Sequence, residues 1–190
     1  GEMYLVHSFL DKAQSSWIYF PGQRRVRLAP SFAYDNPIAG SDNLYFVDQI
    51  NMFTGALDRY DFKLVGKKEM LVPYNSYAVH QKGIPYDQIL KAKTVNPDLL
   101  RYELHRVWVV EADLRTGFSH PYAKRRFYID EDSWQILAVD LYDKGGKLIG
   151  LQESHPINYY DVPVFSSTLE TIYDFKGSRY FVDGLDRSEE

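Results

Sequence analysis

The residues that could carry out chemistry in this sequence are its histidines and its clusters of charged side chains. Only His105 shares a predicted strand with two carboxylates, Glu103 and Glu111, and such a set could bind a metal or act in acid–base chemistry. No histidine belongs to an H-E-x-x-H motif or to another compact metal-ligand spacing. We therefore predict ordinary surface positions for the histidines and turns at the two His-Pro pairs. The five are His7, His80, His105, His120 and His155.

Motifs of the common enzyme classes are absent. The chain contains neither a G-x-S-x-G elbow nor a glycine-rich phosphate loop, and without cysteine it has no thiolate nucleophile, thiolate zinc site or disulfide. The acidic run at residues 130–132 lacks the spacing of a calcium loop, which favours a solvated turn. An enzyme acting on a lipid or a sugar would have to use His80, His105 or His120. We expect no catalytic residue, no metal and no cofactor.

A basic cluster places three arginines in four residues, Arg24, Arg25 and Arg27, directly after a Pro-Gly turn. In an extended strand Arg25 and Arg27 point to one face and Arg24 to the other. A second basic run at residues 124–126 begins another predicted strand, and the two runs together could form a rim that binds phosphate or carboxylate. The alternative is an edge strand that charge protects from aggregation. The net charge of -4 argues against a general nucleic-acid binder.

Strand patterns dominate the chain. Residues 16–20 and 24–28 flank the Pro-Gly turn and predict a hairpin, and residues 102–114 alternate over their whole length. No apolar run reaches the length of about eighteen residues that a membrane-spanning helix needs. We predict one antiparallel sheet with a few helices, a mainly β fold of the α+β class. Further strands are expected at 3–9, 60–65, 69–72, 76–80, 123–129, 134–142, 147–154, 168–175 and 178–182, and helices at 43–53 and 85–93.

Aromatic residues are abundant, with 16 Tyr, 11 Phe and 3 Trp. Trp17 and Tyr19 project from the same face of their strand. Such rings could line a cavity for acyl chains, form a platform for sugars, or fill a core against the helices, and the sequence leaves all three open. The residues predicted to line a cavity are Trp17, Tyr19, Val26, Leu28, Tyr102, Leu104, Trp108, Phe127, Ile129, Trp134, Ile136 and Tyr142, with Arg24, Arg25 and Arg27 at its rim.

Several motifs occur in a characteristic order. The segment W-I-Y-F-P-G-Q-R-R-V-R-L-A-P at residues 17–30 is followed by G-S-D-N-L-Y-F-V-D at 40–48. The runs R-F-Y-I-D at 126–130, W-Q-I-L at 134–137 and Y-D-K-G-G-K at 142–147 come next. This order, which extends over most of the chain, resembles the outer-membrane lipoprotein-sorting proteins of the LolA/LolB-like superfamily. The likeness is strongest to a proteobacterial branch catalogued as a domain of unknown function.

The resemblance implies a LolA-like fold, a curved antiparallel sheet or incomplete β-barrel whose concave face is covered by helices. It implies a non-enzymatic periplasmic module of a Gram-negative bacterium that shelters lipid or lipoprotein acyl chains in an apolar cavity. The resemblance leaves open whether this module is associated with the outer membrane. The alternative is an interaction module of the same fold that binds an inner- or outer-membrane protein without carrying lipid. The chain departs from the lipoprotein carriers at Asn43, where Phe is frequent, and by placing Arg24 and Arg25 after the proline.

The resemblance also bears on the extent of the domain. We expect residues 1–190 to form a single domain of a longer precursor that has lost its signal peptide. The resemblance leaves open whether the N-terminal strands of the complete fold are missing from residues 1–190 as well.

Overall fold

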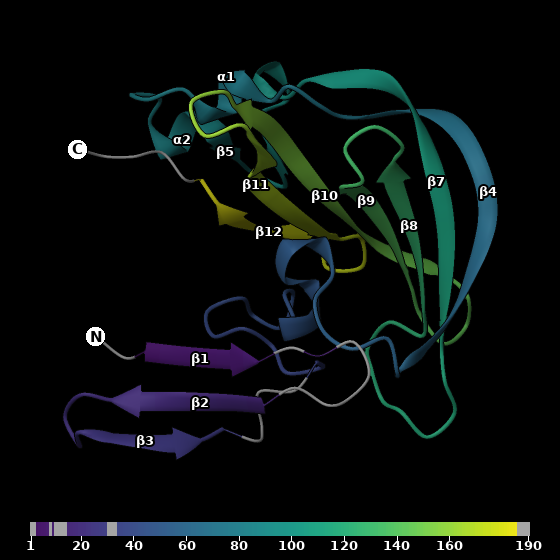
Figure 1. Cartoon of the computed structure of the whole chain (residues 1–190). Coiled ribbons are helices and arrows are strands. Elements are labelled where there is room, and N and C mark those ends of the chain that lie inside the picture. The colour runs from purple at the N-terminus through teal and green to yellow at the C-terminus, as the bar shows by residue number, and fades with distance from the viewer. Residues whose placement is uncertain (1–2, 8, 10–14, 30–33, 186–190) are drawn as a thin grey trace.

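The structure, a computed structural model, describes residues 3–7, 9, 15–29 and 34–185. Figure 1 shows a large curved sheet and, beneath it, a small sheet near the N-terminus. The small sheet pairs its strands in the order β1-β2-β3, which confirms the hairpin predicted around the Pro-Gly turn. None of its described strands pairs with the large sheet. Its strands are β1 (Met3–His7), β2 (Ser15–Phe20) and β3 (Arg25–Leu28).

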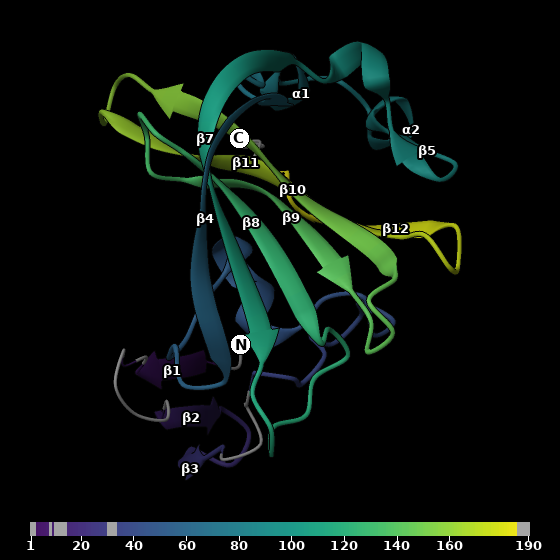
Figure 2. The ribbon, with the colours of Figure 1, turned by 90° about the vertical axis from the view of Figure 1, so that its right-hand side faces the viewer.

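The large sheet is antiparallel and has the order β12-β11-β10-β9-β8-β7-β4. Because β4 and β12 are its two edges, the sheet curves without closing, as Figure 2 shows from the side. The predicted fold class is therefore confirmed. The strands are β4 (Tyr60–Pro73), β7 (Tyr102–Leu114), β8 (Lys124–Asp130), β9 (Ile136–Tyr142), β10 (Leu148–Tyr159), β11 (Val164–Asp174) and β12 (Arg179–Gly184).

Helical turns are short and lie in the connections. The 3-10 helix η1 (Val47–Met52) contacts β9, β10 and β11, and Figure 1 shows it within the curve of the large sheet. Among the described residues, no helix has the length and apolar character needed to cross a membrane. The connection between β4 and β7 contains α1 (Tyr77–His80), α2 (Tyr86–Ile89), β5 (Leu90–Lys91), β6 (Thr94–Val95) and η2 (Pro97–Leu99).

Two helix predictions were too long. In the segment predicted as helix 43–53, only the short 3-10 turns of η1 form, and η1 is itself interrupted at Asn51. The positive φ angles of Asn43 and Asn51, 60° and 53°, exclude a continuous α-helix over this segment. In the segment predicted as helix 85–93, α2 ends at Ile89 and the chain continues as β5, which turns back on β6.

Two strand predictions also need correction. The segment predicted as strand 76–80 contains the helix α1, which begins directly after Ser76. The strands predicted at 60–65 and 69–72 are one strand, β4, which carries a bulge at Gly66. Gly66 has a φ of 146°, a conformation that glycine adopts readily, so the chain passes through the bulge without ending the strand.

The large sheet buries side chains on both of its faces. Directly paired residues share a face, so Val110, Phe127 and Val139 lie together, and they pack in or against one apolar cluster with Met52 of η1. The neighbouring residues Val109 and Tyr128 point to the opposite face and belong to a second cluster. The middle of the sheet is therefore enclosed on both sides.

A buried ion pair joins the segment before β4 to the large sheet. The Arg125 guanidinium donates to Asp48 Oδ2 at 2.7 Å, and both residues are almost fully buried. The backbone N–H of Tyr122 donates to Nδ1 of His120, which leaves Nε2 to face Asp48 Oδ1 at 3.3 Å. Burial alone would raise the pKa of Asp48, but the charge of Arg125 and the contact with His120 hold it below its usual value.

Removing one charge of this pair should strongly destabilise the fold. We expect Asp48→Asn to lower the free energy of unfolding by about 3–5 kcal/mol, because Arg125 would keep an uncompensated buried charge. The matched control is Arg126→Gln, which breaks a pair with Glu111 at the surface and should cost at most about 1 kcal/mol. Urea denaturation measures both, and equal losses in the two variants would show that the buried pair has no special role.

A second buried acid lies on β10. Tyr102 donates from its hydroxyl to both oxygens of Glu153, at 3.1 and 3.3 Å. Burial raises the pKa of Glu153 to about 7, against an ordinary value of 4.5, and the hydrogen bond from Tyr102 opposes this shift. Below pH 4.5 the carboxyl is neutral in both the folded and the unfolded chain. As the pH rises from 4.5 to about 7 the unfolded chain ionises first, so stability is lost over that interval.

Glu153→Gln should remove this loss. We expect the variant to gain stability relative to the unchanged protein as the pH rises from 5 toward 7.5, because glutamine cannot ionise. Urea denaturation at several pH values in that range measures the difference. The control Glu69→Gln removes an exposed carboxyl on β4 and should follow the unchanged protein. A Glu153→Gln curve parallel to that of the unchanged protein would contradict the proposed ionisation.

Candidate functional site

An apolar face of the small sheet is the candidate binding surface. Strand pairing places Trp17 opposite Leu5 on one side and Leu28 on the other. Tyr19 lies opposite Met3 and Val26 in the same way, so all of these side chains project from one face. This face forms a groove of about 480 Å³, which we call the apolar groove. It is lined by Met3, Leu5, His7, Trp17, Tyr19 and Val26.

The apolar groove is open to solvent. Leu5 is 54% exposed and Val26 is 64% exposed, although both are aliphatic. The ring of His7 packs edge-on against that of Trp17, with 5.1 Å between their centroids. Scattered exposed aliphatic residues are common on proteins, but a contiguous apolar face indicates a surface that binds something. Among the described residues nothing covers this face.

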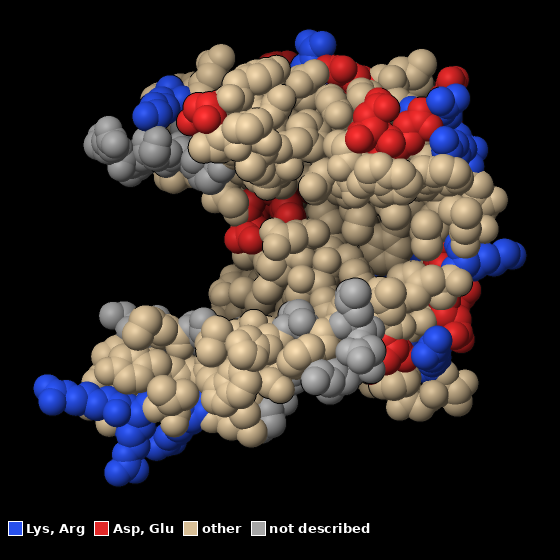
Figure 3. All heavy atoms as spheres, viewed as in Figure 1, with Lys and Arg blue, Asp and Glu red and all other residues tan. Residues whose placement is uncertain are grey.

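The three arginines of the predicted rim lie at the end and on the back of the small sheet. Arg24 is in the turn between β2 and β3, with a φ of 50°. Arg25 pairs with Phe20 and Arg27 with Ile18, so both point away from the apolar groove. In the described part of the chain no carboxylate forms an ion pair with any of the three, and all are exposed. Figure 3 shows the basic side chains gathered around the free end of this sheet.

The second basic run does not extend this rim. Arg125 is buried against Asp48, while Lys124 and Arg126 bind the carboxylate of Glu111 on β7. These residues belong to the large sheet, so a joint rim of the two runs is wrong. Alternation along the strand predicted which side chains share a face, but it carries no information about Asp48, which lies 77 residues earlier.

The structure brings together only four of the predicted lining residues, Trp17, Tyr19, Val26 and Leu28. The other predicted lining residues belong to the large sheet, where they lie in different environments. Phe127, Ile129 and Ile136 pack in or against the cluster that contains η1. Tyr102 and Tyr142 bind carboxylates, Glu153 and Asp140. Leu104 and Trp134 are 67% and 69% exposed, and the half-buried Trp108 lies under the ammonium of Lys67.

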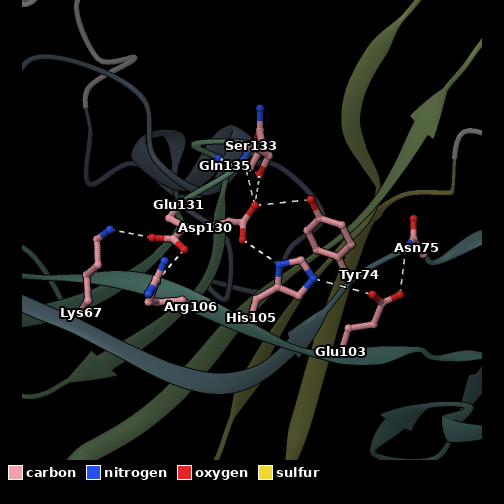
Figure 4. A network of polar contacts seen from close by, with 10 residues as sticks. All are labelled: Lys67, Tyr74, Asn75, Glu103, His105, Arg106, Asp130, Glu131, Ser133 and Gln135. Atoms are coloured by element: carbon pink, nitrogen blue, oxygen red, sulfur yellow. Dashed lines mark hydrogen bonds and ion pairs between the residues drawn. The ribbon is translucent and has the colours of Figure 1, made fainter.

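A polar network surrounds His105 on β7 (Figure 4). Nδ1 of His105 lies 2.9 Å from Asp130 Oδ1, and its Nε2 lies 3.7 Å from Glu103. The other Asp130 oxygen accepts from the hydroxyl and the backbone N–H of Ser133 and faces the Tyr74 hydroxyl at 3.4 Å. The ring of Tyr74 stacks on that of His105 with 4.0 Å between centroids. The network closes the β8–β9 turn onto β7 and β4.

This network does not have the arrangement of a nucleophilic site. In such a site a hydroxyl faces the histidine, whereas Ser133 donates to Asp130 on the side away from His105. His105, Asp130 and Asp132 offer ligand atoms within 4.8 Å of one another. A cation there would replace the hydrogen bond between His105 and Asp130, since an imidazole nitrogen cannot bind both. The predicted solvated turn holds for Asp132, which is exposed, but Glu131 is largely covered by its ion pairs with Lys67 and Arg106, and Asp130 is fully buried.

The prediction that the histidines occupy surface positions is wrong for His120 and His155. His120 is buried beside Asp48 and Arg125, and burial together with the charge of Arg125 lowers its pKa. His155 is fully buried in β10, where burial lowers its pKa to about 4. Pro156 lies at a β-bulge in the middle of β10 and not in a turn. Proline fits there because it has no N–H to pair.

His80 does not complete a catalytic pair with the other two candidates either. It lies in α1, with Nδ1 2.8 Å from the Thr168 hydroxyl. His80, His105 and His120 thus contact different residues in different parts of the fold. Sequence reasoning also missed Met3 and Leu5 as lining residues. The alternation of Met3, Leu5 and His7 within the strand predicted at 3–9 contained the signal for them.

Comparisons with known proteins place the chain in a family. A family model described as a protein of unknown function, DUF1329, matches residues 1–190. An uncharacterised protein of Pseudomonas aeruginosa is 47% identical over 192 residues, which is 100% of this chain and 42% of that protein. The chain therefore spans less than half the length of this curated relative.

Two solved structures share the fold. A domain from Vibrio parahaemolyticus, whose name assigns it to outer membrane lipoprotein sorting, aligns with a TM-score of 0.55 and 17% identity over 98% of this chain and 66% of that one. A DUF1329 family protein from Desulfovibrio piger aligns with a TM-score of 0.56 and 18% identity over 96% and 62%. At the level of the fold, these structures confirm the resemblance to lipoprotein-sorting proteins. The sequence match over the whole chain shows that it belongs to the DUF1329 family.

Proposed function

We propose that this chain is a non-enzymatic module that binds lipid or lipoprotein acyl chains. The observation that carries the proposal is the apolar groove, which offers aliphatic and aromatic side chains to solvent on one face of the small sheet. Burial of each CH₂ group contributes about 0.8 kcal/mol, so an open apolar surface can bind an acyl chain without any catalytic group. The fold that the chain shares with a domain named for outer membrane lipoprotein sorting supports the same function.

The proposed site is the apolar groove of the small sheet and not a closed cavity in the curve of the large sheet, which the resemblance implied. Phe127, Ile129 and Ile136, which were predicted to line such a cavity, pack with the side chains around η1. The groove instead lies on a sheet that no described strand joins to the large one. An acyl chain in the groove would lie across β1, β2 and β3, with Trp17 and Tyr19 at the centre of the contact.

The proposal includes a periplasmic location, at which lipids pass between two membranes. A protein named for outer membrane lipoprotein sorting has the same fold, and this likeness supports the location. The absence of an enzymatic role stays a prediction of the sequence. The arrangement around His105 supports it, because the Ser133 hydroxyl donates to Asp130 and no hydroxyl of the described residues donates to the imidazole.

An interaction module that binds a membrane protein is the second candidate. The openness of the apolar groove favours it, because Met3 and Leu28 are each 62% exposed, as they would be in a flat protein-binding surface. Pull-down from solubilised membranes, combined with lipid extraction of the same purified protein, separates the two functions. Bound lipid without a retained protein supports the carrier, and a retained protein without lipid supports the interaction module.

A charge placed in the apolar groove should weaken acyl-chain binding. We expect Val26→Asp to raise the Kd for a fluorescent fatty acid about ten- to hundredfold, since the carboxylate would lose hydration against the chain. Val26 is exposed on the edge strand β3, so the change removes no core contact. Fluorescence titration in solution measures the Kd, and circular dichroism verifies that the variant is folded.

The matched control is Leu104→Asp. Leu104 is as exposed as Val26, is also aliphatic, and lies on β7 outside the groove. We expect this variant to bind the fatty acid like the unchanged protein. Loss of binding in Leu104→Asp with normal binding in Val26→Asp would move the site to the large sheet. An unchanged protein that binds no fatty acid, and that carries no lipid when purified from cells, would refute the carrier function.

A further inference from the structure

We propose that the small sheet docks on the surface of a bilayer that contains anionic phospholipids. Its apolar groove would face the acyl chains, and Arg24, Arg25 and Arg27 would lie among the phosphate headgroups. This inference goes beyond the proposed function, because it concerns where the module meets a membrane and not which molecule it carries. It rests on the distribution of side chains over the two faces and the free end of the sheet.

The small sheet divides its charged residues unequally between its two faces. Met3, Leu5 and Val26 project from a face that has no charged side chain among the described residues, whereas Arg25 and Arg27 project from the other face, beside Val6, Ile18 and Phe20. Interfacial helices have the same division, with an apolar face buried about 5–10 Å deep and basic residues on the polar face at the level of the headgroups. Arg25 and Arg27 lie on β3, the edge strand of this single thin sheet. Their guanidinium groups, although on the back of the sheet, can therefore reach the level of the headgroups.

Charge complementarity selects an anionic surface. The chain as a whole has a net charge of -4, which would repel an anionic bilayer, but the free end of the small sheet carries three exposed arginines. Within the described residues these arginines have no carboxylate partner, unlike Arg106 and Arg126 on the large sheet. Guanidinium groups bind phosphate with two parallel hydrogen bonds, which suits them to phospholipid headgroups.

Aromatic residues in the groove fit the same position. Tryptophan and tyrosine concentrate where acyl chains meet headgroups, because their rings are apolar and their N–H or O–H groups remain hydrated. Trp17 and Tyr19 occupy β2, the central strand of the small sheet, with aliphatic residues on both neighbouring strands. The tip of the β2–β3 turn, Pro21 and Gly22, is exposed and carries no charge that would resist approach to a membrane.

Sedimentation with vesicles tests the docking surface. The unchanged chain should bind vesicles of equimolar phosphatidylcholine and phosphatidylglycerol more tightly than pure phosphatidylcholine, and added salt should weaken this binding. The combined variant Arg24→Gln, Arg25→Gln and Arg27→Gln should lose about a hundredfold in partitioning, because each basic residue near such a surface contributes about fivefold. The matched control, Lys144→Gln, Lys147→Gln and Lys176→Gln, removes the same charge from exposed turns of the large sheet and should bind like the unchanged chain.

Depth measurements test the orientation. In a variant with Trp108→Phe and Trp134→Phe, Trp17 is the remaining tryptophan of the chain. Its fluorescence should be quenched by vesicles whose acyl chains carry bromine near the headgroup. Equal binding to the two vesicle compositions, no binding, an equal loss in the lysine control, or unquenched Trp17 would each overturn the proposal. So would light scattering that shows a dimer in the unchanged chain and a monomer in Val26→Asp, because a second copy would then cover the groove.

Fatty-acid binding in solution distinguishes this proposal from the carrier function. The arginine variant should keep the Kd of the unchanged chain for a fluorescent fatty acid, since Arg25 and Arg27 point away from the groove. Loss of vesicle binding with intact fatty-acid binding therefore supports docking as a separate property. If the unchanged chain binds the fatty acid but does not bind anionic vesicles, docking is refuted and the carrier function is still supported.

Discussion

The buried contact between Arg125 and Asp48 is the interaction on which the arrangement of the large sheet depends. It joins a side chain of β8 to η1, and both charges are removed from water. Two ions in such a place cost several kcal/mol to desolvate, so the stability of the pair depends on its short contact and on the groups packed around it. His120 supplies one such contact to Asp48, and the rings of Tyr60 and Tyr122 lie 5.1 and 5.4 Å from the guanidinium.

Fixing η1 in this way fills the curve of the large sheet. Met52 and Phe46 pack with Phe127, Val139 and Ile172 in the curve of the large sheet, so the side chains of the segment before β4 occupy this face. Gln49 extends the contact by donating to Gln152 on β10. An apolar groove stays open on the small sheet, whereas the resemblance to lipoprotein carriers implied a cavity within one curved sheet.

Local alternation predicted most of the strands, and it predicted the faces of the small sheet. Residues 102–114 were predicted as a strand with the bounds that β7 has, and Trp17 and Tyr19 share a face as expected. The helix predicted at 43–53 failed because apolar spacing does not show that Asn43 and Asn51 adopt positive φ. Partners distant in sequence were beyond this reasoning. Arg125 has the same sequence context whether it lies at a rim or beside Asp48, and only the tertiary fold distinguishes the two.

The small size of this sheet makes its stability depend on what covers its open face. Short strands in a sheet of this size gain enough stability only when one face packs against something apolar. The side chains of Met3, Leu5, Val26 and Leu28 remain largely exposed, so this stabilisation is incomplete in the chain alone. A molecule that covers the groove therefore stabilises the sheet as it binds, because it binds the folded strands and not their unfolded form. The affinity measured for an acyl chain or a bilayer would then include the free energy of stabilising the sheet.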